Sequence, residues 1–466
     1  MKKRLLSILM AATMVATCFA GCGSDKKASS GPAYSDGGKV FNIYCWNTEF
    51  QDRVKAFYPG YVDNGDGTGM IGDVQVNWII TPSKDNAYQN ALDNALLAQD
   101  KAAADDKVDL FLIEADYALK YVNSDYTLDV NSIGLTADDM AGQYKYTQEI
   151  VTDSNGVIKG TTWQATPGLF VYRRSIAQEV LGTDDPDAVQ EMLADWDKFD
   201  AVAAKMYDAG YKMLSGYDDS YRTFSNNVSG PWVQDGKIVV DPNIERWVEQ
   251  TKLYTDSGYN NKTTLWSPEW GADQGSKGNV FGFFYSTWGI NFTLLGNSLD
   301  TPIPDGVDKL NTPEEYVKAT EGNGGFGDWA VCYGPESYYW GGTWICGASG
   351  TDNVSLIKDI MYTLTCDAEV MKKITEVTED FTNNEAAMTE LAKGYSSAFL
   401  GGQNHIALFV EAAKKIDMSN ASGYDQGLNE GFQAAMKDYF DGNISYEEAL
   451  EAFFKAAVVK YPDLKY

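Results

Sequence analysis

Short hydrophobic runs alternate with longer amphipathic stretches through much of this chain. The runs at 40–46, 74–81 and 108–113 have the length and the apolar content of strands, and the spacing of apolar residues over 87–99 predicts a helix. Strands that alternate with helices are typical of α/β proteins, in which mostly parallel sheets are covered by helices on both faces. The first part of the chain is therefore predicted to form an α/β unit.

The same alternation returns in the middle of the chain, and the C-terminal region reads as helical. There, Ser445 and Glu448 have the spacing of a capping box ahead of the apolar residues Leu450 and Phe453. The pattern thus indicates a second α/β unit followed by helices. The expected elements of that unit are strands at 169–172, 211–214 and 280–285 and helices at 189–209 and 243–257.

A Gly/Asp-rich insertion at 63–69 separates the first two predicted strands. Acidic residues near glycines suggest a calcium loop of the EF-hand type, which needs acids at positions 1, 3 and 5, glycine at position 6 and glutamate at position 12. Counting from Asp63 gives neither that glycine nor that glutamate. The insertion is predicted to be the tip of a hairpin.

The first residues have the pattern of a secretory signal. Lys2, Lys3 and Arg4 precede an apolar run, which ends at Ala20-Gly21-Cys22. Small residues directly before a cysteine resemble the lipobox of bacterial lipoproteins, although Phe19 stands where that family usually has leucine. The resemblance implies a signal peptide at 1–21 and lipidation of Cys22, and the polar stretch 22–37 resembles a flexible tether. An ordinary signal followed by an incidental cysteine is the alternative.

The composition of the chain indicates which classes of binding partner are unfavourable. The formal net charge of −29 disfavours nucleic acid, whose phosphates such a surface repels. With a single histidine, His405, and no CxxC spacing, neither a metal site nor a cofactor is expected. Two interpretations stay open for the cysteines outside the signal and the lipidation site, namely one disulfide or free buried thiols. They are Cys45, Cys332, Cys346 and Cys366.

Five short motifs follow one another after the lipobox-like start. They are Tyr44-Cys45-Trp46-Asn47-Thr48-Glu49, Glu114-Ala115-Asp116, Phe170-Val171-Tyr172-Arg173-Arg174, Gly282-Phe283-Phe284-Tyr285-Ser286-Thr287-Trp288-Gly289 and Trp340-Gly341-Gly342-Thr343-Trp344. Each motif alone is weakly specific. In order and spacing, however, the chain resembles the extracellular solute-binding lipoproteins of carbohydrate ABC importers, the maltose-binding type, over nearly its whole length.

The resemblance implies a two-lobed α/β fold of the periplasmic-binding-protein type II class, with a ligand cleft between the lobes and a helical C-terminal region. Lobe one would comprise 38–165 and 335–378, and lobe two 166–334 and 379–466. Such a protein captures an oligosaccharide outside the cell and delivers it to two permease subunits with a cytoplasmic ATPase, without catalysis. We expect a monomer, anchored by its lipid to the outer face of the cell membrane.

Sugar binding suggests which side chains to look for, because rings stack on the apolar face of a sugar while carboxylates, amides and arginines bind its hydroxyls. In α/β sheets ligands meet the carboxyl ends of strands. Trp46, Asn47 and Glu49 follow one predicted strand, and Glu114 and Asp116 end another. These five are candidate ligand residues, although Asp116 is equally suited to cap a helix.

The remaining candidates belong to the crossings and to lobe two. Trp288 lies where the family places its stacking tryptophan, with an indole packed in the core as the alternative. Of Trp340 and Trp344, one is expected to face the ligand while the other packs in the core. Alternatives stay open for the other candidates, since arginine also pairs with neighbouring acids and amides also form turns. These candidates are Trp163, Gln164, Arg222, Gln403 and Asn404, with Trp232, Trp266 and Trp270 as residues that would lengthen the aromatic platform.

Two other classes of function use similar residues. A secreted glycoside hydrolase also combines tryptophans with carboxylates, but it needs two of them about 5–10 Å apart across the scissile bond. A polysaccharide-binding adhesin is the other alternative, although a deep cleft between lobes suits short free oligosaccharides better than insoluble chains.

Overall fold

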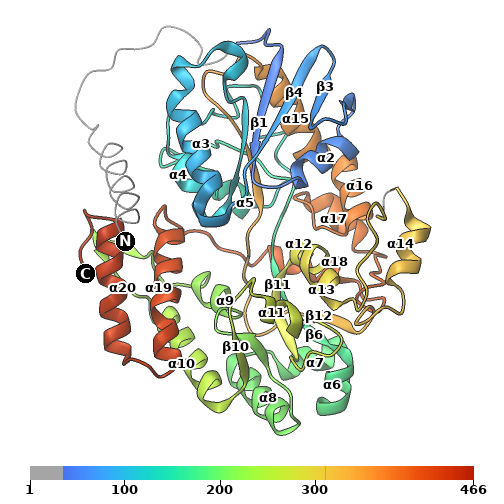
Figure 1. The fold of residues 1–466 in the computed structure, drawn as a ribbon, viewed down its shortest axis with the longest axis vertical. Helices are drawn as coiled ribbons and strands as arrows, with labels where there is room; N and C mark the ends of the chain where they lie inside the picture. Colours follow the sequence, from blue (N-terminus) through green and yellow to red (C-terminus); the bar gives the residue numbers. More distant parts are fainter. Residues whose placement is uncertain (1–34, 310) are drawn as a thin grey trace.

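The protein consists of two lobes, which lie one above the other in Figure 1. The structure is a computed structural model and describes residues 35–309 and 311–466. The predicted signal peptide, the lipidation site Cys22 and most of the tether lie outside the described residues. Within them, no helix is long and apolar enough to cross a membrane.

The sheet of the first lobe has six strands in the order β13-β5-β1-β4-β3-β2. Its centre is parallel, as predicted, because β1 pairs with β4 and β5 in that sense. Strand β13, which comes from far along the chain, is antiparallel to β5, and β3 is antiparallel to β4. The strands are β1 (Val40–Cys45), β2 (Tyr61–Asp63), β3 (Thr68–Ile71), β4 (Val74–Ile80), β5 (Leu110–Glu114) and β13 (Thr343–Gly347).

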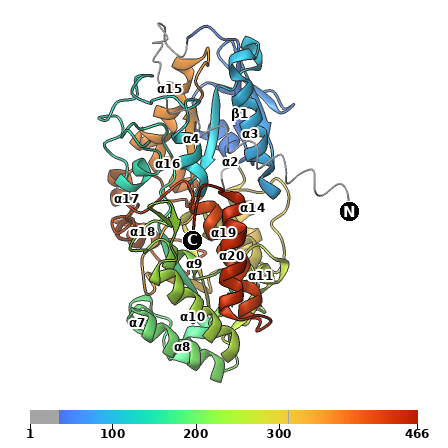
Figure 2. The same cartoon turned by 90° about the vertical axis from the view of Figure 1, so that its left-hand side faces the viewer.

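Helices cover both faces of this sheet, whose central strands are mostly apolar. Figure 2 shows α3 on one side of β1 and α15 and α16 on the other. On β1, Phe41, Ile43 and Cys45 are fully buried. The helices of this lobe are α2 (Glu49–Phe57), α3 (Ala87–Ala98), α4 (Ala118–Val122), α5 (Lys145–Glu149), α15 (Val354–Thr365) and α16 (Ala368–Thr378).

The insertion at 63–69 is the tip of the β2–β3 hairpin, as the sequence predicts. Its carboxylates accept hydrogen bonds from backbone amides of the turn. Asp63 accepts a hydrogen bond from the Gly65 amide at 3.0 Å, and Asp66 accepts one from the Thr68 amide at 3.0 Å. Asp63 also pairs with Lys55. Among the described residues there is no group of acids, cysteines or histidine arranged to hold a metal ion.

Most strand pairs in the second lobe are antiparallel, whereas the sequence predicted mostly parallel sheets. Strand β6 is central in a three-stranded sheet and is antiparallel to both β11 and β12. Parallel pairing is limited, in the described residues of this lobe, to the short pair β7 and β10 and to isolated bridges such as that between Lys212 and Val280. The prediction of mostly parallel sheets is therefore wrong for this lobe. Its strands are β6 (Gly168–Arg173), β7 (Leu214–Gly216), β8 (Val233–Gln234), β9 (Lys237–Ile238), β10 (Asn260–Thr263), β11 (Gly282–Ser286) and β12 (Trp329–Cys332).

The single helix predicted over 189–209 is two helices. The side chain of Asp195 accepts a hydrogen bond from the Lys198 amide at 2.9 Å, so a new helix begins there. The helices of this region are α6 (Arg174–Leu181), α7 (Pro186–Met192), α8 (Trp196–Asp208), α9 (Tyr221–Ser225), α10 (Pro242–Ser257), α11 (Pro268–Asp273), α12 (Thr287–Gly289), α13 (Leu295–Ser298) and α14 (Pro313–Thr320), with a π-helical turn at Ile290–Leu294.

The C-terminal region is helical, as predicted, and α19 lies beside α20 on the second lobe (Figure 1). The capping box of Ser445 and Glu448 is present at the start of α20. The four helices are α17 (Glu385–Leu391), α18 (His405–Ala413), α19 (Asp425–Phe440) and α20 (Tyr446–Lys460).

Three segments carry the chain between the lobes, and they bond to one another. Gln164 pairs with Thr382, and Pro167 pairs with Tyr339, as isolated antiparallel bridges. The amide of Ala165 also donates to the Phe381 carbonyl at 3.1 Å. The connection between the lobes is thus a hydrogen-bonded bundle of three segments. The lobe boundaries predicted from the sequence stay predictions.

All four cysteines in the described part of the chain are free, so the interpretation as buried or half-buried thiols holds and that of a disulfide does not. Burial in apolar surroundings raises the pKa of the Cys45 thiol to about 12. These thiols therefore contribute to packing and carry no charge.

Candidate functional site

Asp116 and Arg222 join the two lobes across the cleft. Asp116 follows β5, and Arg222 lies on α9, in the second lobe. Two hydrogen bonds connect the guanidinium to the carboxylate, at 2.9 and 2.6 Å. The guanidinium also lies 5.5 Å from the ring centre of Trp340. Arg222 forms an ion pair, but with Asp116 of the other lobe and not with its neighbours Asp218 or Asp219, the partners that the sequence suggested.

The neighbouring carboxyl groups of Glu114 and Asp116 differ in how readily they ionise. Burial and the nearby Asp116 raise the pKa of Glu114 well above its usual range. Burial also opposes ionisation of Asp116, but the Arg222 guanidinium outweighs it and lowers the pKa of that carboxyl. Glu114 accepts the Asp116 amide at 2.8 Å. The site therefore offers one firmly ionised acid and one that holds its proton more readily.

A cavity of about 500 Å³ lies beside this ion pair, between the lobes. Asp116 and Leu119 line it from the first lobe, and Tyr221, Arg222 and Leu265 from the second. Its size is within the range of small-molecule pockets. Two further carboxylates of α19, Asp425 and Glu430, also face it, and burial raises the pKa of Asp425 to about 6.

Three tryptophans gather beside Gly341, in the second crossing. Trp288 donates its ring nitrogen to the Trp340 carbonyl at 3.0 Å, and the two rings meet edge to face with centres 5.4 Å apart. Trp266 lies 5.9 Å from Trp340. Gly341 has a φ of +66°, and a Cβ there would come within 3.3–3.5 Å of Trp288 and of the Glu114 carboxylate. Glycine thus lets a carboxylate of one lobe approach an indole of the other.

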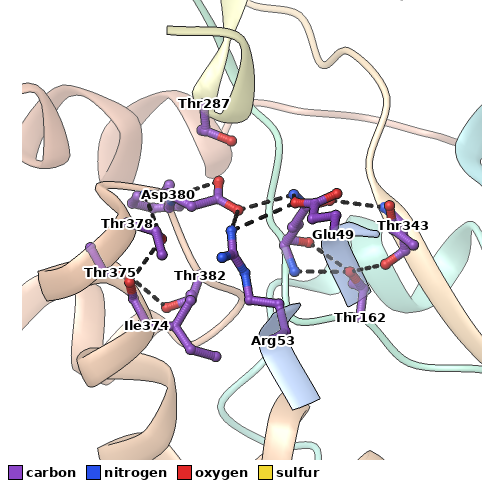
Figure 3. Close-up of polar contacts among 12 residues, drawn as sticks. Glu49, Arg53, Thr162, Thr287, Thr343, Ile374, Thr375, Thr378, Asp380 and Thr382 are labelled. Atoms are coloured by element: carbon purple, nitrogen blue, oxygen red, sulfur yellow. Dashed lines mark hydrogen bonds and ion pairs between the residues drawn. The ribbon is translucent and has the colours of Figure 1, made fainter. Parts of the chain in front are cut away.

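A second polar cluster, which we call the hinge cluster, consists of Glu49, Arg53, Gln164, Thr343 and Asp380. Figure 3 shows Glu49, Arg53, Thr343 and Asp380 close together. The side-chain amide of Gln164 donates to both Glu49 and Asp380 at 3.0 Å, and its oxygen accepts the Thr343 amide at 3.1 Å. Gln164 and Asp380 belong to the first and third crossings, Thr343 begins β13 directly after the second, and Glu49 and Arg53 belong to α2. One glutamine side chain therefore connects the first and third crossings, and the end of the second, to the first lobe.

The hinge cluster holds two carboxyls but a single cation. Arg53 lies 3.6 Å from Glu49 and 3.9 Å from Asp380, and Thr287, the neighbour of Trp288, points toward Asp380 (Figure 3). Burial raises the pKa of Glu49 to about 7; Arg53 lowers it, while Asp380 and Asp52 raise it. Burial also raises the pKa of Asp380. Near neutral pH the pair therefore readily retains one proton.

Two predicted tryptophans lie in the core and present no face to a ligand. Trp163 is 1 % exposed and stacks on Phe50, with ring centres 5.4 Å apart. Trp344 is fully buried and donates its ring nitrogen to the Thr147 carbonyl at 2.8 Å. Both leave our set of ligand residues because they are buried. The sequence alone does not distinguish an indole packed in the core from one that stacks on a ligand.

Two predicted amides are engaged with backbone. Gln403 accepts from the Val331 amide at 2.8 Å and donates to the Val331 carbonyl at 2.7 Å. Asn404 caps α18 through the Ala407 amide. Here the turn interpretation prevails, so these residues also leave the set.

The start of α2 supplies the remaining predicted residues. Asn47 accepts the Glu49 amide at 3.0 Å, and half-buried Trp46 contacts the Tyr88 ring with centres 5.3 Å apart. The prediction missed Arg53, Tyr339, Asp380, Asp425 and Glu430. Of these, only Arg53 had a signal in the sequence, because it lies one helical turn after Glu49.

Comparison with known proteins agrees with this architecture. The family model for bacterial extracellular solute-binding proteins matches residues 68–398. The chain belongs to this family. No curated protein matches this solute-binding protein.

Solved structures resemble this solute-binding protein over most of its length. A crystal structure of an extracellular solute-binding protein of family 1 has a TM-score of 0.71 and 16 % identity, over 90 % of this chain and 99 % of that one. An ABC transporter-associated binding protein from B. animalis subsp. lactis Bl-04, solved with β-1,6-galactobiose, has a TM-score of 0.65 and 16 % identity, over 92 % and 99 %. The sugar-binding protein MalE from Xanthomonas citri has 0.63 and 12 %, over 91 % and 98 %. These likenesses confirm the two-lobed α/β fold.

Proposed function

We propose that this protein captures a short oligosaccharide outside the cell and delivers it to the permease of an ABC importer. The observation that carries the proposal is that both lobes contribute to one cavity, with carboxylates and an arginine inside it and tryptophan rings beside it. Carboxylates and guanidinium bind hydroxyls, and indoles cover the apolar faces of sugar rings. The proposed ligand residues are Trp46, Asn47, Glu49, Glu114, Asp116, Arg222, Trp288 and Trp340. Gln164 leaves the set, because it is 2 % exposed and its side-chain amide is engaged by Glu49, Asp380 and Thr343.

Several properties of related binding proteins support the proposal. The family is extracellular, and the neighbours from B. animalis and X. citri are a transporter-associated binding protein and a sugar-binding protein. Delivery would require a permease that recognises the protein when the lobes have closed on the glycan. We propose that the protein acts as a monomer without a cofactor.

Binding without cleavage is the first expected result. A panel of purified glycans, screened by thermal shift, should contain at least one that raises the melting temperature, since a ligand at 100 times its Kd stabilises by about 2.7 kcal/mol. The bound glycan should stay intact, because Arg222 donates to both oxygens of the Asp116 carboxylate, which is therefore not free to act as a nucleophile or a base. Steady release of reducing ends from it would favour a glycoside hydrolase instead.

We also propose that Cys22 carries the lipid anchor, on the basis of Ala20-Gly21-Cys22 after a short apolar run. In the native host, the Cys22→Ser variant should appear in the medium or keep its uncleaved signal. Acyl labelling of wild type and variant measures this. Labelling that is equal in both would show that the cysteine is incidental.

A further inference from the structure

Two exposed aromatic side chains flank the tryptophans of the proposed site. Trp266 is 56 % exposed and Phe292 is 69 % exposed. All twelve tryptophans of the chain belong to the described residues, and the other eleven are buried or half-buried. Trp232 and Trp270, the other two residues considered as extensions of the platform, are 7 % and 2 % exposed. Exposure therefore singles out Trp266 among the three.

The backbone that presents these two rings is unusual at both positions. Trp266 has a φ of 68°, in the left-handed region that bulky residues rarely occupy. Phe292 lies in the π-helical turn Ile290–Leu294, directly after α12. π-turns and strained non-glycine residues both occur preferentially at functional sites. The fold thus tolerates two unfavourable local conformations, and both present an aromatic ring to solvent beside Trp288.

Trp266 is nevertheless held firmly by other rings. Its ring centre lies 5.4 Å from Trp270, 5.9 Å from Trp340 and 6.2 Å from Trp288. The planes of Trp266 and Trp288 differ by 14°, so the two indoles are nearly parallel, in an offset-stacked arrangement. A ring already fixed in this way loses little conformational entropy when a ligand packs on it.

The two exposed rings also share a hollow next to the cleft. An open hollow of about 650 Å³ is lined by Trp266, Phe292, Pro268 and Asn297. Leu265, the residue before Trp266, lines the cavity between the lobes. Consecutive residues of one segment thus line the cavity and the hollow, and Trp266 also lies against Trp288 of the proposed site, with ring centres 6.2 Å apart.

We propose that Trp266 and Phe292 form an outer subsite, which stacks on a sugar unit of a glycan whose inner units occupy the cavity between the lobes. This inference rests on the proposed function and specifies its substrate class, namely glycans long enough to extend past the cavity. An exposed, apolar, pre-ordered pair of rings, both in contact with Trp288 of the proposed site, matches the apolar face of a pyranose. Trp266 thus determines preference for chain length.

Calorimetry with glycan series of graded length tests this inference. The probes are malto-, cello-, xylo-, manno- and β-1,6-galacto-oligosaccharides of two to six units, and the series that wild type binds best is used for the variants. Trp266→Ala should weaken binding of the longer members by about 2- to 10-fold, the range for one ring contact, and leave the shortest bound member unchanged. Trp266→Tyr, which keeps a ring, should retain most of the preference for length.

Matched controls separate the possible outcomes. Tyr207→Ala, which removes an aromatic residue that is 49 % exposed and lies outside the hollow, should change no affinity. An equal loss for short and long glycans, no loss, or tighter binding by Trp266→Ala would overturn the outer subsite and leave the proposed function standing. If wild type binds no member of any series, the proposed function fails, and the subsite with it.

Discussion

Replacing Trp288 by alanine will weaken glycan binding by about 5- to 150-fold, since stacking an indole on a sugar face in a closed cleft contributes roughly 1–3 kcal/mol. The structure adds a reason for this large effect. The ring nitrogen of Trp288 is anchored to the Trp340 carbonyl at 3.0 Å, so its orientation is fixed before a ligand arrives. Calorimetry with the glycan identified in the panel measures the loss.

The Trp288→Phe variant is the matched control, because it keeps a ring but loses the anchoring hydrogen bond. Its affinity should fall between those of wild type and Trp288→Ala. A Trp288→Ala protein that melts like wild type and binds the glycan with unchanged affinity would show that Trp288 only packs against its neighbours.

The second large effect concerns stability and pH at the hinge cluster. Burial raises the pKa of Glu49 from 4.5 to about 7 in the folded protein. Between these values the folded state holds a proton that the unfolded state releases, so the free energy of unfolding falls as pH rises through this window. The full shift corresponds to about 3 kcal/mol, and since the side chain keeps 23 % exposure we expect about 1–3 kcal/mol.

The Glu49→Gln variant should remove this penalty. At pH 8 it should be more stable than wild type by about 1–3 kcal/mol, while near pH 4.5 the two should be equal, because wild type is then protonated. Its amide oxygen can still accept the bond from Gln164. Urea unfolding at a series of pH values measures the difference, with Glu191→Gln on the exposed side of α7 as the control. The same stability difference at every pH would contradict a proton held by the hinge cluster.

The sequence predicts best those elements whose hydrophobic pattern decides their structure locally. Strands β1, β4 and β5 come within two residues of their predicted bounds, because each is an apolar run between turns. Pairing direction is not local. Strand β13 joins the first sheet antiparallel from more than 200 residues away, and β6 lies between two antiparallel neighbours. The rule that alternating strands and helices form parallel sheets therefore failed in the second lobe.

The contacts within the site, like the pairing direction of strands, are not decided by local sequence. Strand ends indicated Glu49, Glu114 and Asp116, and a family motif indicated Trp288. Nothing in the sequence indicated that Arg222 reaches Asp116 across the cleft, or that Asp380 would share the Gln164 amide with Glu49. Contacts of this kind depend on how the crossings bring distant segments together. Burial likewise decided among the tryptophans, whose local sequences look alike.

Strand β13 is synthesised long after β5, its neighbour in the first sheet, and this order affects how the first lobe can form. Until Thr343–Gly347 emerges, the edge of β5 that it covers has no strand beside it, although Phe111, Leu112 and Ile113 are almost fully buried in the finished protein. At ordinary synthesis rates this gap of about 230 residues lasts roughly 10–40 s. An apolar edge left open for that time invites pairing with other chains. The first lobe, although it begins first, cannot be completed as a nascent domain, and a fragment that ends before β13 would be prone to aggregate.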